Sequence, residues 1–185
     1  MNRRNFIECS AASALALPLA AQEPQLPRKA MPLDVILPDG TKLNTSRYAG
    51  KVCVVEFLFT TCSHCQEASR HLSALNREFG PRGLQPIGAA FNDGAMMLVP
   101  AFIKENNVNY PVGVVSREKV LEYMSFSAMM RLTVPMVAFI DRRGNIRYQS
   151  NPVGQEALHS EQRMRQIVEE LIKEPAGAAG KGKKS

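Results

Sequence analysis

Residues 52–66 read VCVVEFLFTTCSHCQ, an apolar run that ends at two cysteines separated by two residues. The run from Val52 to Phe59 is apolar on both faces apart from Glu56, which is typical of a central strand covered on both sides. Beyond it, residues with the spacing of one helix face continue to a stop at Gly80-Pro81. They are Cys65, Ala68, Ser69, Leu72, Leu75 and Phe79. The stretch therefore predicts a buried strand that runs directly into a helix.

Three roles fit the two cysteines: a structural disulfide, half of a zinc site, or a reversible redox pair. A structural zinc site needs two further ligands, but there is no second C-x-x-C, and His71 and His159 form no paired motif. A helix start favours a thiolate, because free backbone N–H groups and the positive end of the helix dipole face it. The register exposes Cys62 and covers Cys65, which suits an attacking and a resolving thiol. We therefore predict a redox pair and no metal site.

Length and charge narrow the class of protein. At 185 residues the chain is expected to form one domain. The formal net charge is +6, and a Gly/Ala-rich tail supplies three of these charges through Lys181, Lys183 and Lys184. We expect residues 176–185 to be a disordered basic tail, because this composition buries no apolar surface. No basic stripe with interleaved aromatic residues is present, so we predict no nucleic-acid partner.

The first residues, MNRRNFIECSAASALALPLAAQ, combine a basic start, a short apolar stretch and small residues at the end. This pattern is typical of an export signal, and Arg3-Arg4-Asn5-Phe6-Ile7 resembles the twin-arginine signature. An N-terminal amphipathic helix of the folded domain is the alternative interpretation. We expect residues 1–21 to be a signal peptide and the mature chain, without a transmembrane segment, to be periplasmic. A Pro-rich leader, 22–30, would then precede a domain of residues 31–175.

The mature chain would keep three cysteines: Cys53, Cys62 and Cys65. An odd number argues against a purely structural disulfide framework. Cys53 lies inside the apolar run, where a free cysteine behaves as a small hydrophobe. Methionines on helices usually fill the core, and we expect this of Met124, Met129 and Met130.

The rest of the chain predicts an α/β fold with a mixed sheet. Residues 31–52 suggest a short strand, a turn at Pro38-Asp39-Gly40 and a return segment. The later elements are expected to be a strand at 84–91, helices at 95–107 and 117–130 around a strand at 110–115, a hairpin at 134–150 and an amphipathic helix at 154–174. The apolar face of that last helix would consist of Leu158, Met164, Ile167, Val168, Leu171 and Ile172.

The strand, the C-x-x-C that opens a helix and the later TVPMVAFID segment resemble the thioredoxin superfamily. The segment LPDGTKLNTSRYAGKVCVVEF and the insertion between Leu84 and Val134 resemble its exported TlpA-like branch, over residues 31–173. The resemblance implies a thioredoxin-like fold: a mixed central β-sheet flanked by helices, with an N-terminal hairpin and an inserted helix–strand segment. The sequence departs from the family at Thr61, where tryptophan is usual, and at Ser63-His64, where x-Pro is commoner.

The resemblance also implies catalytic roles for four residues. Cys62 and Cys65 match the redox pair, Glu56 matches the buried acid that exchanges a proton with the inner cysteine, and Pro135 matches the cis-proline that faces the pair. Burial would raise the pKa of Glu56 toward neutrality, as that role requires.

Neighbouring residues are expected to tune the pair and to hold the client. Ser63 and His64 lie between the cysteines, and a positively charged His64 would stabilise the reduced form and make the pair more oxidising. Val134 and Met136 flank Pro135, and we expect them to border the substrate groove.

We predict an exported thiol–disulfide oxidoreductase that exchanges disulfides with cysteine-containing client proteins and is recycled by a redox partner. No cofactor is expected, because the Cys62–Cys65 pair carries the electrons, and we expect a monomer. The main alternative is a copper-handling, Sco-like protein with the cysteines and a histidine as ligands. A peroxidase fits less well, because Phe59 stands at the threonine position of the P-x-x-x-T-x-x-C motif. The sequence leaves open whether the pair oxidises, reduces or isomerises.

Overall fold

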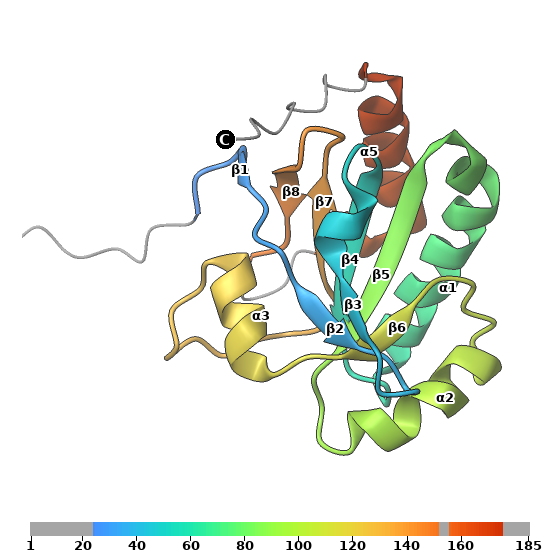
Figure 1. Ribbon diagram of the computed structural model, residues 1–185, viewed down its shortest axis with the longest axis vertical. Coiled ribbons are helices and arrows are strands. Elements are labelled where there is room, and N and C mark those ends of the chain that lie inside the picture. The colour runs from blue at the N-terminus through green and yellow to red at the C-terminus, as the bar shows by residue number, and fades with distance from the viewer. Residues whose placement is uncertain (1–23, 152–155, 176–185) are drawn as a thin grey trace, which may run out of the picture.

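The computed structural model describes residues 24–151 and 156–175 (Figure 1). The predicted signal peptide, residues 1–21, and the predicted tail, residues 176–185, lie outside the described residues. The described part is built on one mixed sheet of eight strands in the order β1-β8-β7-β4-β5-β6-β2-β3. The strands are β1 (Arg28–Lys29), β2 (Asp34–Ile36), β3 (Lys42–Asn44), β4 (Val52–Leu58), β5 (Leu84–Ala90), β6 (Val112–Val114), β7 (Met136–Ile140) and β8 (Asn145–Gln149). The predicted α/β class and mixed sheet are confirmed.

Strand β4 lies at the centre of the sheet, parallel to β5 and antiparallel to β7. All seven of its residues are buried, as the apolar run predicted. Because side chains alternate along a strand, Val54 and Leu58 face one hydrophobic cluster while Val55 and Phe57 face another. The sheet is therefore covered on both faces.

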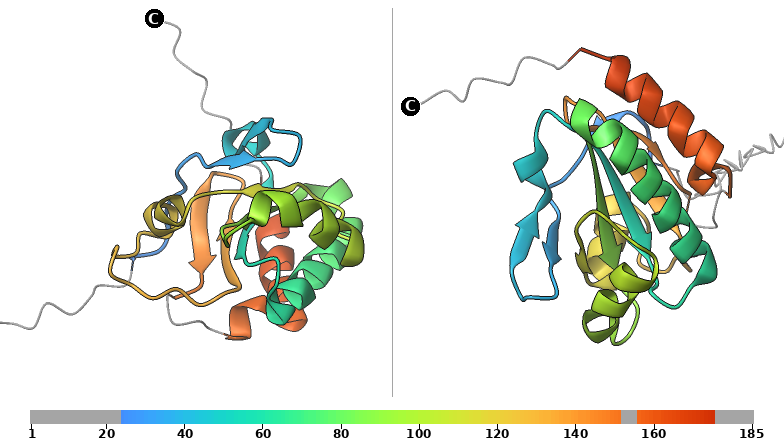
Figure 2. Two further views of the ribbon diagram at one scale, coloured as in Figure 1. Left: turned by 90° about the horizontal axis from the view of Figure 1, so that it is seen from below. Right: turned by 90° about the vertical axis from the view of Figure 1, so that its right-hand side faces the viewer.

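Helices α1 (Ser63–Phe79) and α5 (Glu161–Lys173) lie side by side on one face of the sheet, as Figure 2 shows. Their predicted apolar stripes are buried against the first cluster, to which α2 (Ala95–Glu105) also contributes. The second cluster is covered by α3 (Arg117–Met124) and by the segment that contains β2 and β3. Two short 3-10 helices, η1 (Thr45–Tyr48) and η2 (Gly80–Arg82), and α4 (Glu156–His159) complete the order of elements.

The predicted N-terminal hairpin is formed by β2 and β3, and it joins the sheet where Ile36 pairs with Val114. Gly113 allows this approach, because a Cβ atom there would overlap the carbonyl oxygen of Ile36. The predicted domain boundary at residue 31 is wrong, however. Arg28–Lys29 forms the edge strand β1, which pairs with β8, so part of the Pro-rich leader belongs to the sheet.

Two predicted helices are shorter than their sequence pattern suggested. The helix expected at 117–130 ends at Met124, because Ser125 takes a left-handed conformation with φ of 57° and donates its N–H to the Glu122 carbonyl oxygen. The final helix is divided at Ser160, whose hydroxyl accepts a hydrogen bond from the Arg163 N–H and so caps α5. Met129, expected in the core, is 94% exposed in the segment that follows α3.

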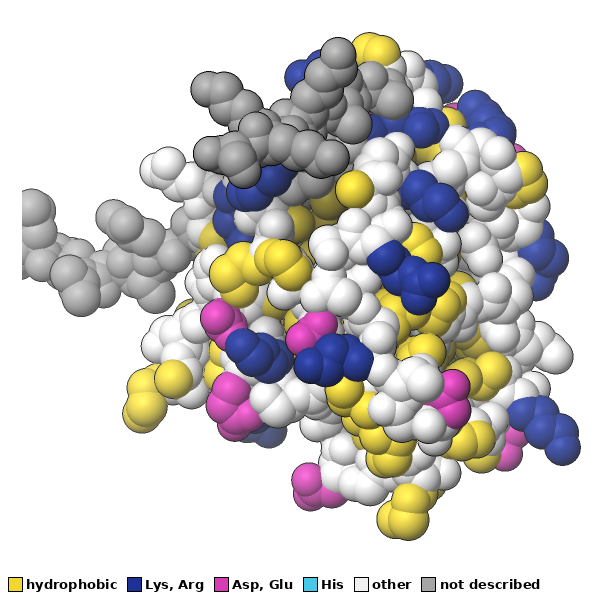
Figure 3. All heavy atoms as spheres, viewed as in Figure 1, with side chains coloured by type: hydrophobic (Ala, Val, Ile, Leu, Met, Phe, Trp, Pro, Cys, Tyr) yellow, Lys and Arg dark blue, Asp and Glu magenta, His cyan; other side chains and the backbone are white. Residues whose placement is uncertain are grey.

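Surface charges of both signs are mixed on the face shown in Figure 3, where Lys and Arg side chains lie among acidic and uncharged ones. None of the helices within residues 24–151 and 156–175 combines the length and apolar character needed to cross a bilayer.

Candidate functional site

The two cysteines lie where β4 passes into α1. Cys62 is the N-cap residue of α1, in an extended conformation, and its carbonyl oxygen accepts the first helical hydrogen bond, from the Gln66 N–H at 3.0 Å. Its side chain makes no capping hydrogen bond to the helix, so the sulfur is not held by the backbone N–H groups of α1. The local sequence produces this arrangement, because a buried strand must end before the polar residues that open the helix.

Burial separates the two thiols. Cys62 is half-buried, whereas Cys65 in the first turn is fully buried against the first hydrophobic cluster. Both are free thiols. Burial raises the pKa of the Cys65 thiol well above its usual value, a backbone hydrogen bond at Phe59 opposes this, and the nearby Glu56 and Cys62 side chains raise it further. Cys62 is thus the reachable sulfur, as the helix register predicted, and Cys65 needs help to lose its proton.

Glu56 lies in the middle of β4 with no exposed surface. Its Oε2 atom accepts hydrogen bonds from the Ser69 hydroxyl at 2.8 Å and the Tyr110 hydroxyl at 3.0 Å. Its Oε1 atom is buried without a hydrogen-bond partner among the described residues. Burial raises the pKa of Glu56 to about 7, although the bonds from Ser69 and Tyr110 act in the opposite direction. The predicted buried, near-neutral carboxyl is therefore present beside the inner cysteine.

Ser69 and Tyr110 were not predicted as site residues. Ser69 gave a weak signal, because it is a hydroxyl on the otherwise apolar stripe of α1, one turn beyond Cys65. Tyr110 precedes β6 and gave no signal, because it is 54 positions from Glu56 in the sequence.

The loop before β7 approaches the cysteines from a distant part of the chain. The Val134–Pro135 peptide bond is cis, and the Val134 carbonyl oxygen lies 4.0 Å from the Cys62 sulfur. Val134 is half-buried and borders this approach. Met136 does not: it is fully buried in the second cluster, so the prediction that it borders a substrate groove is wrong. Met136 begins β7 opposite Phe57, and strand alternation turns its side chain into the core.

Ser63 and His64 are both exposed on the first turn of α1, between the two cysteines. A groove of about 590 Å³ begins beside them at Thr61. Its apolar lining consists of Phe59, Phe91, Leu98 and Leu132, and its polar and charged lining consists of Thr61, Asn92, Asp93, Arg117 and Arg131. Cys62 itself does not line this groove, which reaches the redox pair at the preceding residue, Thr61.

The described residues contain no group of three or more His, Cys, Asp and Glu side chains arranged to bind a metal ion. Within residues 24–151 and 156–175, Cys62 and Cys65 therefore do not belong to such a metal-binding group.

Comparisons with known proteins place this site in a family. The family model described as redoxin matches residues 26–167. No curated protein sequence matches the chain.

Solved structures share the fold at low sequence identity. A thiol:disulfide interchange protein of the thioredoxin family from Chlorobium tepidum TLS is 21% identical, with a TM-score of 0.67 over 80% of this chain and 99% of its own. A thiol:disulfide interchange protein from Bacteroides sp. is 18% identical, with a TM-score of 0.65 over 88% of this chain and 97% of its own. The predicted thioredoxin-like fold is confirmed. The chain, with Cys62 and Cys65 close together at the start of α1, belongs to the redoxin family and is a thiol–disulfide oxidoreductase.

Proposed function

We propose that this oxidoreductase is exported and exchanges disulfides with cysteine-containing proteins through Cys62 and Cys65. One observation carries the proposal: a half-buried thiol begins a helix, and three residues later a fully buried thiol lies beside a buried carboxyl group. Two structures with the same fold are named as thiol:disulfide interchange proteins, which supports cysteine-containing proteins as the clients of this chain.

In the reducing direction, the Cys62 thiolate attacks a client disulfide, forms a mixed disulfide and releases one client sulfur as a thiolate. Cys65 then attacks the Cys62 sulfur, which releases the second client sulfur and leaves a Cys62–Cys65 disulfide. Glu56 takes the proton that Cys65 must lose, a role that its pKa of about 7 suits near neutral pH. Oxidation of a client runs the same steps in reverse, with Glu56 returning the proton.

The surrounding residues position the client. The approach of the Val134 carbonyl oxygen to Cys62 supports a role for the Val134–Pro135 loop in holding a client backbone next to the attacking sulfur. Ser63 and His64 tune the pair from the exposed first turn. The cysteine pair carries both electrons, so the proposed reaction requires no other cofactor. A separate redox partner returns the pair to its starting state, and the protein acts as a monomer.

Residues 1–21 direct the chain out of the cytoplasm in this proposal, through a twin-arginine route to the periplasm. Replacing Arg3 and Arg4 by lysine should leave the uncleaved precursor in the cytoplasm, as cell fractionation would show. Unchanged export of that variant would contradict the route.

The experiment that tests the exchange reaction is the trapping of mixed disulfides. The Cys65→Ser variant should accumulate client adducts that disappear on reduction, because no resolving thiol remains. Cys62→Ser is the matched control and should trap few clients, because Cys65 is fully buried. Equal trapping by both variants would contradict the assigned roles, and adducts from neither would contradict the covalent mechanism.

The copper-handling alternative has less support, because the described residues place no third His, Cys, Asp or Glu ligand with the two cysteines. Metal analysis of protein purified under reducing conditions separates the two functions. One copper per chain, lost in both Cys62→Ser and His64→Ala, would favour the alternative.

A further inference from the structure

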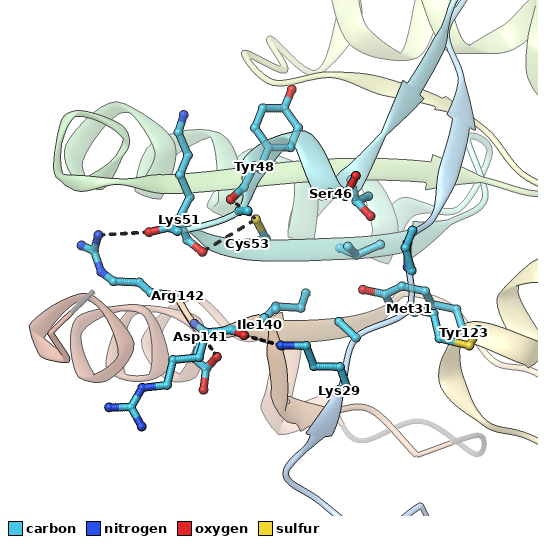
Figure 4. A pocket seen from close by; sticks show the side chains of 18 residues that line it. Lys29, Met31, Ser46, Tyr48, Lys51, Cys53, Tyr123, Ile140, Asp141 and Arg142 are labelled. Atoms are coloured by element: carbon cyan, nitrogen blue, oxygen red, sulfur yellow. Dashed lines mark hydrogen bonds between the residues drawn. The ribbon is translucent and has the colours of Figure 1, made fainter. Parts of the chain in front are cut away.

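A cavity of about 990 Å³ lies on the face of the sheet away from α1 and α5, at the end of β4 opposite the redox pair (Figure 4). Cys62, Cys65, Glu56 and Pro135 do not line it. Its walls come from the segment between β1 and β2, from η1 and the loop that follows it, and from the turn between β7 and β8. The cavity is therefore separate from the site of thiol exchange.

The floor of the cavity is the second hydrophobic cluster, reached through Cys53, Val55, Tyr123 and Ile140. Each of these side chains is at most 8% exposed, and Tyr48 packs beside them. The volume falls at the upper end of the range typical of small-molecule sites, about 300–1,000 Å³. An apolar body, such as two fused or linked rings, fits such a floor.

Tyr123 supplies a polar group inside the cavity. Its ring is only 2% exposed, and Figure 4 shows its hydroxyl pointing into the cavity. No hydrogen bond joins that hydroxyl to another group in residues 24–151 or 156–175, and its oxygen is not among their enclosed unpartnered atoms, so it is open to the space of the cavity. Burial raises the pKa of Tyr123, so the hydroxyl stays protonated and can donate to a ligand atom.

The rim of the cavity is basic. Lys29, Lys51, Arg142 and Arg143 line it, and the described residues contain no carboxylate paired with any of them. Backbone and side-chain oxygens hold three of the four in place: Lys29 donates to the Arg143 carbonyl oxygen, Lys51 to Gln85, and Arg142 to the Arg82 carbonyl oxygen.

The one carboxylate of the lining, Asp141, is already satisfied. It accepts hydrogen bonds from the N–H groups of Arg143 and Asn145, and it pairs with Arg147. It therefore does little to offset the positive charge of the rim.

We propose that this cavity binds a small organic anion, with an aromatic or similarly compact apolar body on the Val55–Ile140 floor and one carboxylate or sulfonate group at the basic rim. The Tyr123 hydroxyl donates a hydrogen bond to a polar atom of the body. This site is independent of the exchange reaction, so the protein can bind such a ligand in either redox state of the cysteine pair.

A matched pair of fluorescent probes tests the proposal. 8-Anilinonaphthalene-1-sulfonate carries the anionic group, and N-phenyl-1-naphthylamine has the same rings without it. The full mature chain should bind the sulfonate probe at one saturable site, at least about tenfold more tightly than the neutral probe, and more weakly at high salt. Because the sequence contains no tryptophan, Tyr48→Trp adds a single donor at the cavity wall, and energy transfer to the probe locates it there.

Charge reversal at the rim, Lys51→Glu with Arg142→Glu, should weaken the sulfonate probe by on the order of tenfold and leave the neutral probe nearly unchanged. Lys104→Glu with Arg77→Glu, two exposed positions in the last turns of α2 and α1, is the control matched for net charge and should change neither. Thermal unfolding and client exchange verify that each variant is folded. Equal affinity for the two probes would overturn the proposal. So would binding that survives the rim reversal but disappears in Met97→Asp, because that probe would be bound at the exposed apolar surface of α2.

Discussion

The two ends of β4 each carry a cysteine, and their surroundings differ. Cys53, near the beginning of the strand, is 8% exposed, and its sulfur lies 3.9 and 4.0 Å from the carbonyl oxygens of Tyr48 and Lys51. Burial raises its pKa to about 12. Cys62, past the other end, begins a helix and is half-buried beside the Val134 carbonyl oxygen. Position relative to the end of the strand, not residue type, decides which thiol is available.

A second comparison explains why one buried thiol suits chemistry and the other does not. Cys53 and Cys65 are both buried with raised pKa values, but only Cys65 has a carboxyl group close by, that of Glu56. A buried thiol without a proton acceptor is inert. Thiol exchange at the Cys62 end of β4 therefore requires an internal base as well as a reachable sulfur.

The largest expected effect follows from the first comparison. Cys62→Ser should lower the rate of exchange with the small disulfide 5,5′-dithiobis(2-nitrobenzoate) by at least about 10³-fold, because the attacking sulfur is gone. Cys53→Ala should change that rate by no more than about twofold, because its thiol is inert. Release of the first thiolate from 5,5′-dithiobis(2-nitrobenzoate) measures both. A large loss of exchange rate in Cys53→Ala would show that the Cys53 thiol is not inert.

The second prediction concerns stability and the carboxyl group that distinguishes the two buried thiols. The folded pKa of Glu56, about 7, is above its ordinary value of 4.5, so the folded state binds this proton more tightly. The stabilisation is fully present below pH 4.5 and is lost as the pH rises through 7. Relative to Glu56→Gln, the wild type should lose about 3 kcal/mol between pH 4 and pH 8, measured by urea unfolding. A difference that is constant with pH would show that Glu56 does not titrate in this range.

The third prediction concerns the hydrogen bond that Tyr110 donates to Glu56. Tyr110→Phe deletes the 3.0 Å hydrogen bond to Oε2 and should raise the pKa of Glu56 further, by roughly one unit. The resolving step, seen as release of the second thiolate from the same reagent, should therefore need a higher pH. Tyr148→Phe is the matched control, because that hydroxyl donates to the surface carboxylate of Glu170 at 2.8 Å. Equal shifts in both variants would remove the special role of Tyr110.

The smallest expected effect is at the exposed first turn. His64→Ala should make the pair more reducing by on the order of 10 mV, because a surface charge contributes only a few tenths of a kcal/mol. Equilibration with glutathione redox buffers measures the potential. A potential of His64→Ala identical to that of the wild type would show that His64 is only a surface residue.

Much of the architecture follows from local patterns. The apolar run of β4, the apolar stripes of α1 and α5 and the turn residues between β7 and β8 each specify their own element, because periodicity and turn chemistry act within a few residues. The ends of α3 and α5 were predicted less well. Ser125 closes α3 in a left-handed conformation, and Ser160 divides the last helical segment, neither of which changes the apolar periodicity.

Local patterns were enough to predict a buried strand from its apolar run, a C-x-x-C motif at the start of a helix and, from the helix register, the greater exposure of Cys62 than of Cys65. Only the tertiary structure decided that Ser69 and Tyr110 hold Glu56, that the Val134 carbonyl oxygen approaches Cys62, and that Met136 is buried. The cavity beside the Cys53 end of β4 was also found only in the tertiary structure. The two kinds of information differ in the sequence separation over which they act. Periodicity reports which face of an element is apolar, but contacts across many tens of residues depend on how the sheet brings separate segments together.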